Sequence, residues 1–353
     1  AIVRSDSSLA ISHDNEAQIT VYYRVVPRHR DLSRSARFQA VGTQDYFFSY
    51  GRNMFIWPAH LDEMQEPVRL LLGGERAGGR WVSTAAEAGR ETLESELSWK
   101  RLADSAYLYG QFRDLSVDLD GHHVAVAIEP QLLLSEHEAL DLLVQLVDTV
   151  NTSLGPPEES HTVVLMLLRK DDPNVATGSG RPGGFVVEVG QNVEVEDAAF
   201  AQLLFHEHLH RYLGGMIQFE RDEEMDTLWF KEGVVDYLAT RLSLRAGVIN
   251  VGDYLDKVTS VVTSYLTNSE AGVPYAEWSE EEYWQSPLRQ RLPYQQGFLL
   301  GLWLDNRGQG RVGLEEMISQ LIVGASSRDR LTNLNIRLFL ETQLDLDLRG
   351  FFR

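Results

Sequence analysis

Hydrophobic residues follow two different patterns along the chain, and the change from one to the other divides the sequence. Between about residues 11 and 129, short alternating or aromatic-rich runs, such as 18–25 and 123–128, are separated by glycine-containing turns. Such runs are typical of strands in a mostly antiparallel β domain. We therefore expect a β-sandwich domain over residues 1–130.

The second half of the chain combines predicted strands with long predicted helices. Ser135 is expected to begin a helix, because Glu138 follows at the spacing of a capping box and apolar residues then recur at helical spacing. Residues 163–168 and 185–189 resemble buried strands, and the residues between them, rich in glycine and proline after 171, are expected to form a loop. Further helices are expected at about 198–213, 227–245, 252–266, 295–306 and 314–321. The pattern predicts an α+β domain over residues 131–353, with a small sheet and a helical bundle.

Composition narrows the classes of function. The 353 residues include 52 acidic and 32 basic ones, a net charge of -20 with no basic tract, so we do not expect a nucleic-acid partner. The longest apolar runs are far shorter than the roughly 20 residues that a membrane-spanning helix needs. The chain begins at alanine rather than methionine, so it is either a trimmed sequence or a mature product from which a targeting peptide has been removed. We expect an exported protein, with a cytoplasmic one as the alternative.

The absence of cysteine restricts the possible chemistry of a site. A chain without cysteine has no disulfide and no thiolate nucleophile, and it can hold a transition metal only through histidine, aspartate and glutamate.

One segment contains a metal-binding pattern. The sequence H-E-x-x-H occurs as His206, Glu207 and His210. Residues four apart lie on one face of a helix, so both imidazoles can bind one cation while Glu207 reaches a water molecule on it. Two imidazoles leave a zinc site one protein ligand short, since a hydrolytic site has three such ligands and one open position.

A second predicted helix supplies the missing ligand. The sequence L-W-F-K-E-G-V-V-D-Y over residues 228–237 carries Glu232 and, one turn later, Asp236. We expect Glu232 to complete the metal site with His206 and His210. A carboxylate at position 236 is well placed to accept a hydrogen bond from the second nitrogen of a ligating histidine, which fixes the orientation of the ring.

These residues resemble the gluzincin metallopeptidases, in which a glutamate on the next helix completes H-E-x-x-H. The sequence L-P-Y-Q-Q-G-F over 292–298 is similar to the P-Y-x-x-G-F element of the aminopeptidase N group and of the glycyl aminopeptidase family. The sequence around Glu232 is most similar to the glycyl aminopeptidases. The resemblance implies a thermolysin-like catalytic domain, a zinc cofactor, a peptide or protein substrate, Glu207 as general base and Tyr294 as the donor to the oxyanion.

Two features depart from that family. Its cleft-side edge strand begins G-G-L-E-H, and the glutamate binds the amine of the substrate; here Gly183 and Gly184 are followed by F-V-V-E-V, with Val186 at the position of the acid. Glu188 is two residues further on and is therefore expected on the same strand face. We expect Gly183, Gly184 and Glu188 to contact substrate. The PDZ domain of the family has no counterpart in this sequence.

Other histidines, acids and aromatic residues have simpler interpretations. We expect His208 to be structural, and His122 and His123 to form a polar turn. The acidic residues between 220 and 226 are interpreted as a solvated loop, and Tyr283 and Trp284 as packing residues with a specificity pocket as the alternative. The sequence favours a zinc peptidase with aminopeptidase-like action. The alternatives are an endopeptidase or other amide hydrolase, and a non-catalytic peptide-binding protein on the same scaffold.

Overall fold

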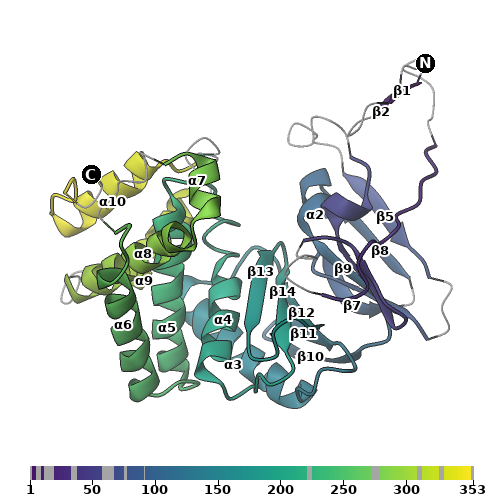
Figure 1. The fold of residues 1–353 in the computed structure, drawn as a ribbon, viewed down its shortest axis with the longest axis horizontal. Coiled ribbons are helices and arrows are strands. Elements are labelled where there is room, and N and C mark those ends of the chain that lie inside the picture. Colours follow the sequence, from purple (N-terminus) through teal and green to yellow (C-terminus); the bar gives the residue numbers. More distant parts are fainter. Residues whose placement is uncertain are drawn as a thin grey trace.

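The computed structural model describes most of the chain. The described residues are 2–4, 9–11, 20–32, 38–57, 67–74, 78–90, 92–220, 225–271, 278–307, 312–325 and 330–350. In Figure 1 the N-terminal β domain lies at one end, a mixed sheet lies in the middle, and the helices lie at the other end.

The N-terminal domain contains a five-stranded antiparallel sheet and a separate two-stranded sheet. The larger sheet has the order β3 (Val41–Gly42), β4 (Tyr46–Tyr50), β9 (Ala106–Gly110), β6 (Arg80–Ser83), β7 (Ala86–Arg90). Strands β5 (Val68–Leu72) and β8 (Leu93–Leu97) form the smaller sheet, and β1 (Ile2–Arg4) pairs with β2 (Leu9–Ile11). Two short helices, α1 (Gly51–Met54) and α2 (Trp99–Asp104), follow β4 and β8. Apolar side chains of the five-stranded sheet, such as Trp81, and of the β5–β8 sheet, such as Leu93, share one core.

One strand expected in this domain is absent. Residues 20–28 lie outside any strand, and Tyr22 is 93% exposed, although the sequence there alternates as a strand does. Residues 18 and 19, where this strand was expected to begin, lie outside the described part of the chain.

The central sheet has five strands, β10 (Arg113–Leu119), β11 (His122–Ile128), β12 (His161–Arg169), β14 (Gly184–Gly190) and β13 (Ala176–Arg181), in that order. Strands β11, β12 and β14 are parallel, and β10 and β13 run antiparallel to their neighbours. The sheet therefore begins at residue 113 and continues across the domain boundary that we expected near residue 130. The predicted loop 171–184 is also wrong in part, because it contains β13.

The two faces of the central sheet pack against different parts of the molecule. Alternate side chains point to opposite faces of a strand. Val124 and Val126 of β11 belong to the core shared with the helices, whereas Ala125 and Ala127 pack with Phe48 of the N-terminal domain. The sheet is thus buried between the helices and the β domain.

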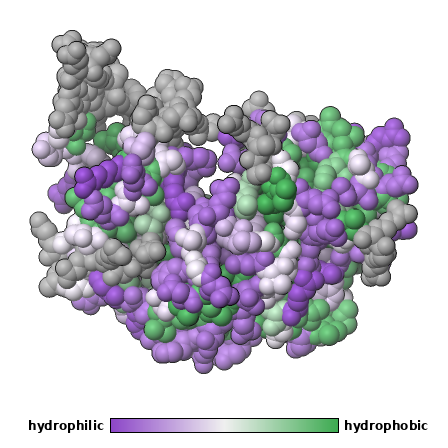
Figure 2. Space-filling view, turned by 180° about the vertical axis from the view of Figure 1, so that it is seen from behind, coloured by the Kyte–Doolittle hydropathy of each residue, from purple (hydrophilic) through white to green (hydrophobic). Residues whose placement is uncertain are grey.

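The helices lie on one side of this sheet. They are α3 (Glu136–Leu154), α4 (Ala198–Leu209), the π-helical segment η4 (Trp229–Val234), α5 (Val235–Ala246), α6 (Val251–Leu266), α7 (Glu280–Gln285), α8 (Pro287–Arg307), α9 (Leu314–Ala325) and α10 (Asn333–Leu344). Helices α3 and α4 pack directly on the sheet. Helix α3 begins as expected, because Ser135 accepts a hydrogen bond from the backbone amide of Glu138. None of the helices in the described residues is long and apolar enough to cross a membrane. Figure 2 shows a largely hydrophilic face, in line with the high content of acidic residues.

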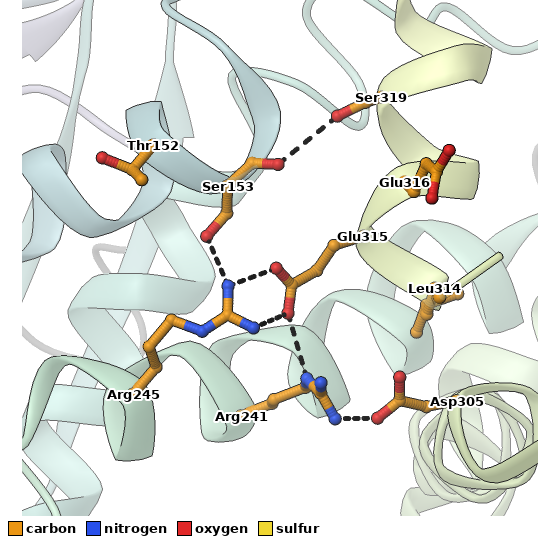
Figure 3. A pocket seen from close by; sticks show the side chains of 10 residues that line it. Thr152, Ser153, Arg241, Arg245, Asp305, Leu314, Glu315, Glu316 and Ser319 are labelled. Atoms are coloured by element: carbon orange, nitrogen blue, oxygen red, sulfur yellow. Dashed lines mark hydrogen bonds and ion pairs between the residues drawn. The ribbon is translucent and has the colours of Figure 1, made fainter. Parts of the chain in front are cut away.

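Ion pairs among three helices and a hydrogen bond to a fourth surround a cavity of about 410 Å³ (Figure 3). Arg241 and Arg245 of α5 both bind Glu315 of α9, with nitrogen–oxygen distances of 3.0 Å for Arg241 and 2.8 Å for Arg245 Nη2. Arg245 also donates to the hydroxyl of Ser153 on α3, and Arg241 pairs with Asp305 of α8. Since each guanidinium is already paired with carboxylates, we interpret this cavity as part of the packing of the bundle.

Candidate metal centre

Helix α4 presents three polar side chains near its end. His206 and Glu207 are buried, and His210 directly follows the last residue of the helix. The rings of His206 and His210 lie 4.7 Å apart between centroids and are almost perpendicular, at 87°. The helical spacing of four residues therefore places both imidazoles on one side of α4, as the sequence predicts.

Glu232 lies against both imidazoles. Its Oε2 is 3.3 Å from Nε2 of His206 and 3.5 Å from Nε2 of His210, and the three candidate ligand atoms all lie within 4.8 Å of one another. Glu232 belongs to η4, and such π-helical segments often occur at functional sites. The residues expected to form the metal site are thus brought together from two separate helical segments.

Electrostatic attraction stabilises the charged forms of His210 and Glu232. Burial opposes the charged form of His210, but the negative charge of Glu232 and a hydrogen bond with it prevail and raise the pKa of His210 to about 9. Burial likewise opposes ionisation of Glu232, but His210 and His206 hold the pKa of its carboxyl well below the usual range. Two imidazoles and one carboxylate suit zinc, which accepts nitrogen and oxygen ligands and keeps an open position in catalytic sites.

Asp236 follows Glu232 by one turn and also lies near His206. The distance from its Oδ1 to Nδ1 of His206 is 3.9 Å, which is too long for a hydrogen bond. Its two oxygens are instead bound by Lys257 of α6, at 2.9 Å to Oδ2 and 3.2 Å to Oδ1. The sequence analysis missed Lys257, because no spacing rule connects it with the two metal-binding segments.

Tyr294 reaches the site from α8. Its ring is stacked with that of His206, with centroids 6.2 Å apart and an interplanar angle of 18°. Burial of the hydroxyl, and then the negative charge of Glu232 and a hydrogen bond to it, raise the pKa of Tyr294 far above the usual range. The hydroxyl therefore remains protonated at neutral pH and can act as a hydrogen-bond donor.

Two glycines allow α8 to approach η4 closely. A Cβ atom on Gly297 would overlap the carbonyl oxygen of Trp229, and a Cβ on Gly233 would lie 2.6 Å from Cα of Gly297. The backbones of the two helices are therefore in direct contact. This contact places Tyr294, three residues before Gly297, beside Glu232.

Strand β13 lies against the other side of the site. A Cβ on Gly178 would overlap the side chain of Glu207, and a Cβ on Gly180 would lie 2.7 Å from Cβ of His210. Because β13 pairs only with β14, it is the edge strand of the central sheet next to α4. Gly178 and Gly180 were not identified from the sequence, although the alternation of glycine in A-T-G-S-G-R is a signal of close backbone approach.

The structure corrects our expectation for Gly183, Gly184 and Glu188. Strand β14 pairs with β12 on one side and with β13 on the other, so it is not an edge strand. Gly183 has a φ of +74° in the turn before β14, and Gly184 packs against the backbone of Val163. Glu188 lies on the same strand face as Val186, which packs with the N-terminal domain and not with α4.

The other histidines considered in the sequence are not part of the cluster formed by His206, His210 and Glu232. His208 is fully buried, neither of its ring nitrogens has a hydrogen-bond partner among the described residues, and burial lowers its pKa well below the usual value. His122 is buried and binds the hydroxyl of Thr162, while His123 pairs with Asp118. The expected polar turn is therefore wrong for both residues, because they lie in β11 directly after the turn at 120–121. Residues 221–224 of the acidic segment lie outside the described part of the chain.

Fold and site together resemble those of the gluzincin, aminopeptidase-like metallopeptidases. Within this class, residues 199–297 match the family described as M61 glycyl aminopeptidase. This match includes both helical segments of the candidate metal centre and Tyr294. No curated protein matches the sequence.

Solved structures support the fold assignment. An aminopeptidase N family protein from Idiomarina loihiensis is 14% identical with a TM-score of 0.72, over 89% of this chain and 59% of its own. An M1 zinc metallopeptidase from Deinococcus radiodurans is 13% identical with a TM-score of 0.60, over 90% of this chain and 70% of its own. A mutant of that enzyme was solved with a Tyr-Ser-Ala substrate, and aligns at 14% identity over 93% of this chain and 73% of its own, with a TM-score of 0.59. The chain thus spans 59% of the length of the Idiomarina protein.

Proposed function

We propose that the protein is a zinc-dependent peptidase that hydrolyses peptide bonds with an activated water molecule. The observation that supports this most directly is the convergence of His206, His210 and Glu232, with ligand atoms within 4.8 Å of one another. A bound zinc ion would supply a Lewis acid that polarises the scissile carbonyl and lowers the pKa of a water molecule.

The residues around the metal ligands have complementary roles in this proposal. Glu207 accepts the proton of the attacking water and passes it to the leaving amine, which requires a carboxylate on the substrate side of α4. Tyr294 donates its hydroxyl to the oxygen that becomes negatively charged in the transition state. Its raised pKa supports this role, since the hydroxyl keeps its proton at neutral pH. Asp236 orients His206.

The substrate is proposed to be a peptide or protein that binds in an extended conformation along β13. This strand is the last strand of its sheet in the described part of the chain, and it passes directly beside Glu207 at Gly178. An extended peptide could pair with that edge through main-chain hydrogen bonds. Because glycine leaves no side chain between β13 and Glu207, the backbone of such a peptide could reach the base.

Aminopeptidase-like action is the proposed mode of cleavage, by similarity to the M61 family. The second candidate is an endopeptidase. It is favoured by one specific observation, because Glu188 lies on the opposite face of the sheet and cannot bind the amine of a substrate at Glu207. A panel of peptides with free and with acetylated amino termini would distinguish the two modes.

The test of the proposed chemistry is the Glu207→Gln variant. Glutamine preserves the shape of the side chain but cannot accept the proton, so zinc should still bind while hydrolysis falls by roughly 10² to 10⁴-fold. Zinc content is measured by elemental analysis and turnover with a peptide mixture. Hydrolysis above about a tenth of the wild-type rate, or a wild-type protein that takes up no zinc, would contradict the proposal.

A further inference from the structure

Lys257 is a charged residue whose position the proposed function does not explain. It lies on α6, outside the segments that carry the metal ligands, and its side chain is 29% exposed. Its ammonium group binds both oxygens of Asp236 and lies 5.9 Å from the centroid of the Phe298 ring on α8. Lys257 therefore contacts the two segments that carry Asp236 and Tyr294.

We infer that Lys257 is a positioning residue of the metal centre, which holds the carboxylate of Asp236 against His206 and thereby strengthens zinc binding. This inference rests on the proposed function of the site.

The position of Asp236 requires a nearby cation. Asp236 is a half-buried carboxylate on the same helical face as Glu232, and Glu207 adds a further negative charge to the site. Like charges at such short range repel one another, and in a partly buried site water screens this repulsion incompletely. An Asp236 side chain without a counter-ion would be expected to turn towards solvent, away from His206. Lys257 offsets this repulsion through its two contacts.

Lys257 binds both oxygens of Asp236 but holds Oδ1, the oxygen near His206, less closely than Oδ2. Lys257 is closer to Oδ2, at 2.9 Å, whereas Oδ1 is the atom that faces Nδ1 of His206 at 3.9 Å. A shift of the carboxylate by roughly 1 Å would bring Oδ1 within hydrogen-bond distance of that nitrogen. A ligating histidine that donates its second ring N–H to a carboxylate has a fixed orientation and a more basic ligating nitrogen. Lys257 would thus act on the metal through Asp236 and not by direct contact.

A double-mutant cycle on zinc affinity tests this inference. The proteins are the wild type, Lys257→Met, Asp236→Asn and the double variant, with zinc affinity measured by competition with a chromophoric chelator. Asp236→Asn should weaken zinc binding by roughly 10 to 100-fold, and Lys257→Met by a smaller factor of about 3 to 10. In the double variant, loss of Lys257 should cause no further change, because Lys257 acts only through the carboxylate.

Controls separate this role from simple packing. Lys170→Met removes the same charge from an exposed position and should leave zinc affinity unchanged. If Lys257 only attaches α6 to α5, Lys257→Met would lower the stability of the metal-free protein while zinc affinity stays within twofold of the wild type. Lys257→Gln provides a second variant with a polar side chain if the methionine variant folds poorly.

Three outcomes would overturn the inference. Unchanged or tighter zinc binding by Lys257→Met would show that Lys257 does not support the ligand, and equal effects of Lys257→Met with and without Asp236 would show that the two residues act independently. In both cases a wild type that binds zinc leaves the proposed function intact. A wild type that takes up no zinc would overturn the proposed function together with this inference.

Discussion

Glu159 is predicted to be a determinant of stability, because it connects the end of the metal-binding helix with the N-terminal domain. Its Oε2 is 3.3 Å from Nη2 of Arg211, the residue directly after His210, and its Oε1 is 3.3 Å from Nη1 of Arg101 on α2. The side chain of Arg211 is only 1% exposed, and it also donates to the hydroxyl of Thr162. Glu159→Gln would leave the buried guanidinium without its counter-charge.

The expected cost can be worked out from this geometry. Removing one partner of a buried ion pair costs about 3–5 kcal/mol. The side chain of Glu159 is 26% exposed, so water reduces this cost, whereas the proximity of two guanidiniums increases it. We therefore expect Glu159→Gln to lower the free energy of unfolding by about 2–4 kcal/mol at pH 7, towards the lower end of the range for buried ion pairs. With an unfolding entropy of about 2.1 cal/mol/K per residue, this loss corresponds to a decrease of about 3–5 °C in Tm.

The pH dependence of this effect has a defined sign. Burial opposes ionisation of Glu159, but the positive charges of Arg211 and Arg101 prevail and lower the pKa of its carboxyl from the usual 4.5. A group with a lowered pKa in the folded state contributes stability above its unfolded pKa and loses it as the pH falls through the folded pKa. The difference in the free energy of unfolding between wild type and Glu159→Gln should therefore be fully present at pH 7 and decrease below about pH 4.5.

The assay is urea denaturation of both proteins at several pH values, followed by a fluorescence signal. Glu158→Gln is the matched control, since Glu158 precedes Glu159 in sequence but is exposed. A difference of less than about 0.5 kcal/mol between the two variants at pH 7 would refute the reasoning, because exposed substitutions typically stay within that range. A difference that grows as the pH falls would show that the pairing with the arginines is assigned the wrong sign.

Three further predictions concern the site itself. Tyr294→Phe should lower kcat by roughly 10² or more with little change in KM, because the hydroxyl acts mainly in the transition state. Only one oxygen atom is removed, so Tm should stay near the wild type, and a stable variant with full activity would exclude the role. Gly297→Ala should lower the free energy of unfolding by about 3 kcal/mol or more and weaken zinc binding, because the added methyl group overlaps the backbone of Trp229. The control is Gly324→Ala on α9, whose methyl group meets no atom within 4 Å and should be neutral in urea denaturation. Chelation of zinc should lower Tm, because a zinc ion present at about 100 times its dissociation constant stabilises the folded state by about 2.7 kcal/mol. If calorimetry shows no shift in Tm after chelation, the metal does not connect α4 with η4.

The two histidines of the candidate metal centre could be predicted from sequence because their arrangement depends on local geometry. His206 and His210 are four residues apart on one helix, and this spacing alone places them on the same face. Glu232 was expected for a different reason, because two imidazoles leave a zinc site one ligand short and the next predicted helix carries a glutamate. The predicted helix starts were similarly local, as the contact between Ser135 and the amide of Glu138 shows.

The strands of the central sheet could be assigned less well, because pairing between strands is not local. The segment A-T-G-S-G-R of β13 contains no aromatic residue and two glycines, so its composition indicated a loop. It is a strand because β14 supplies its hydrogen-bond partners. Strand β11 has the alternation of any β domain, and only its parallel pairing with β12 assigns it to the central sheet. The edge strand was misplaced for the same reason.

The convergence of the site depends on residues without side chains, which explains why its ligands were easier to predict than its shape. Two of the elements that meet α4 and η4 do so through glycine: Gly178 and Gly180 of β13 contact Glu207 and His210, and Gly297 of α8 contacts Gly233. Side-chain chemistry identifies which groups can bind zinc or transfer a proton. The distances between those groups follow from how closely the backbones approach, and a Cβ atom at any of these glycines would separate the elements. Small substitutions at these glycines should therefore disturb the site as much as the loss of a ligand does.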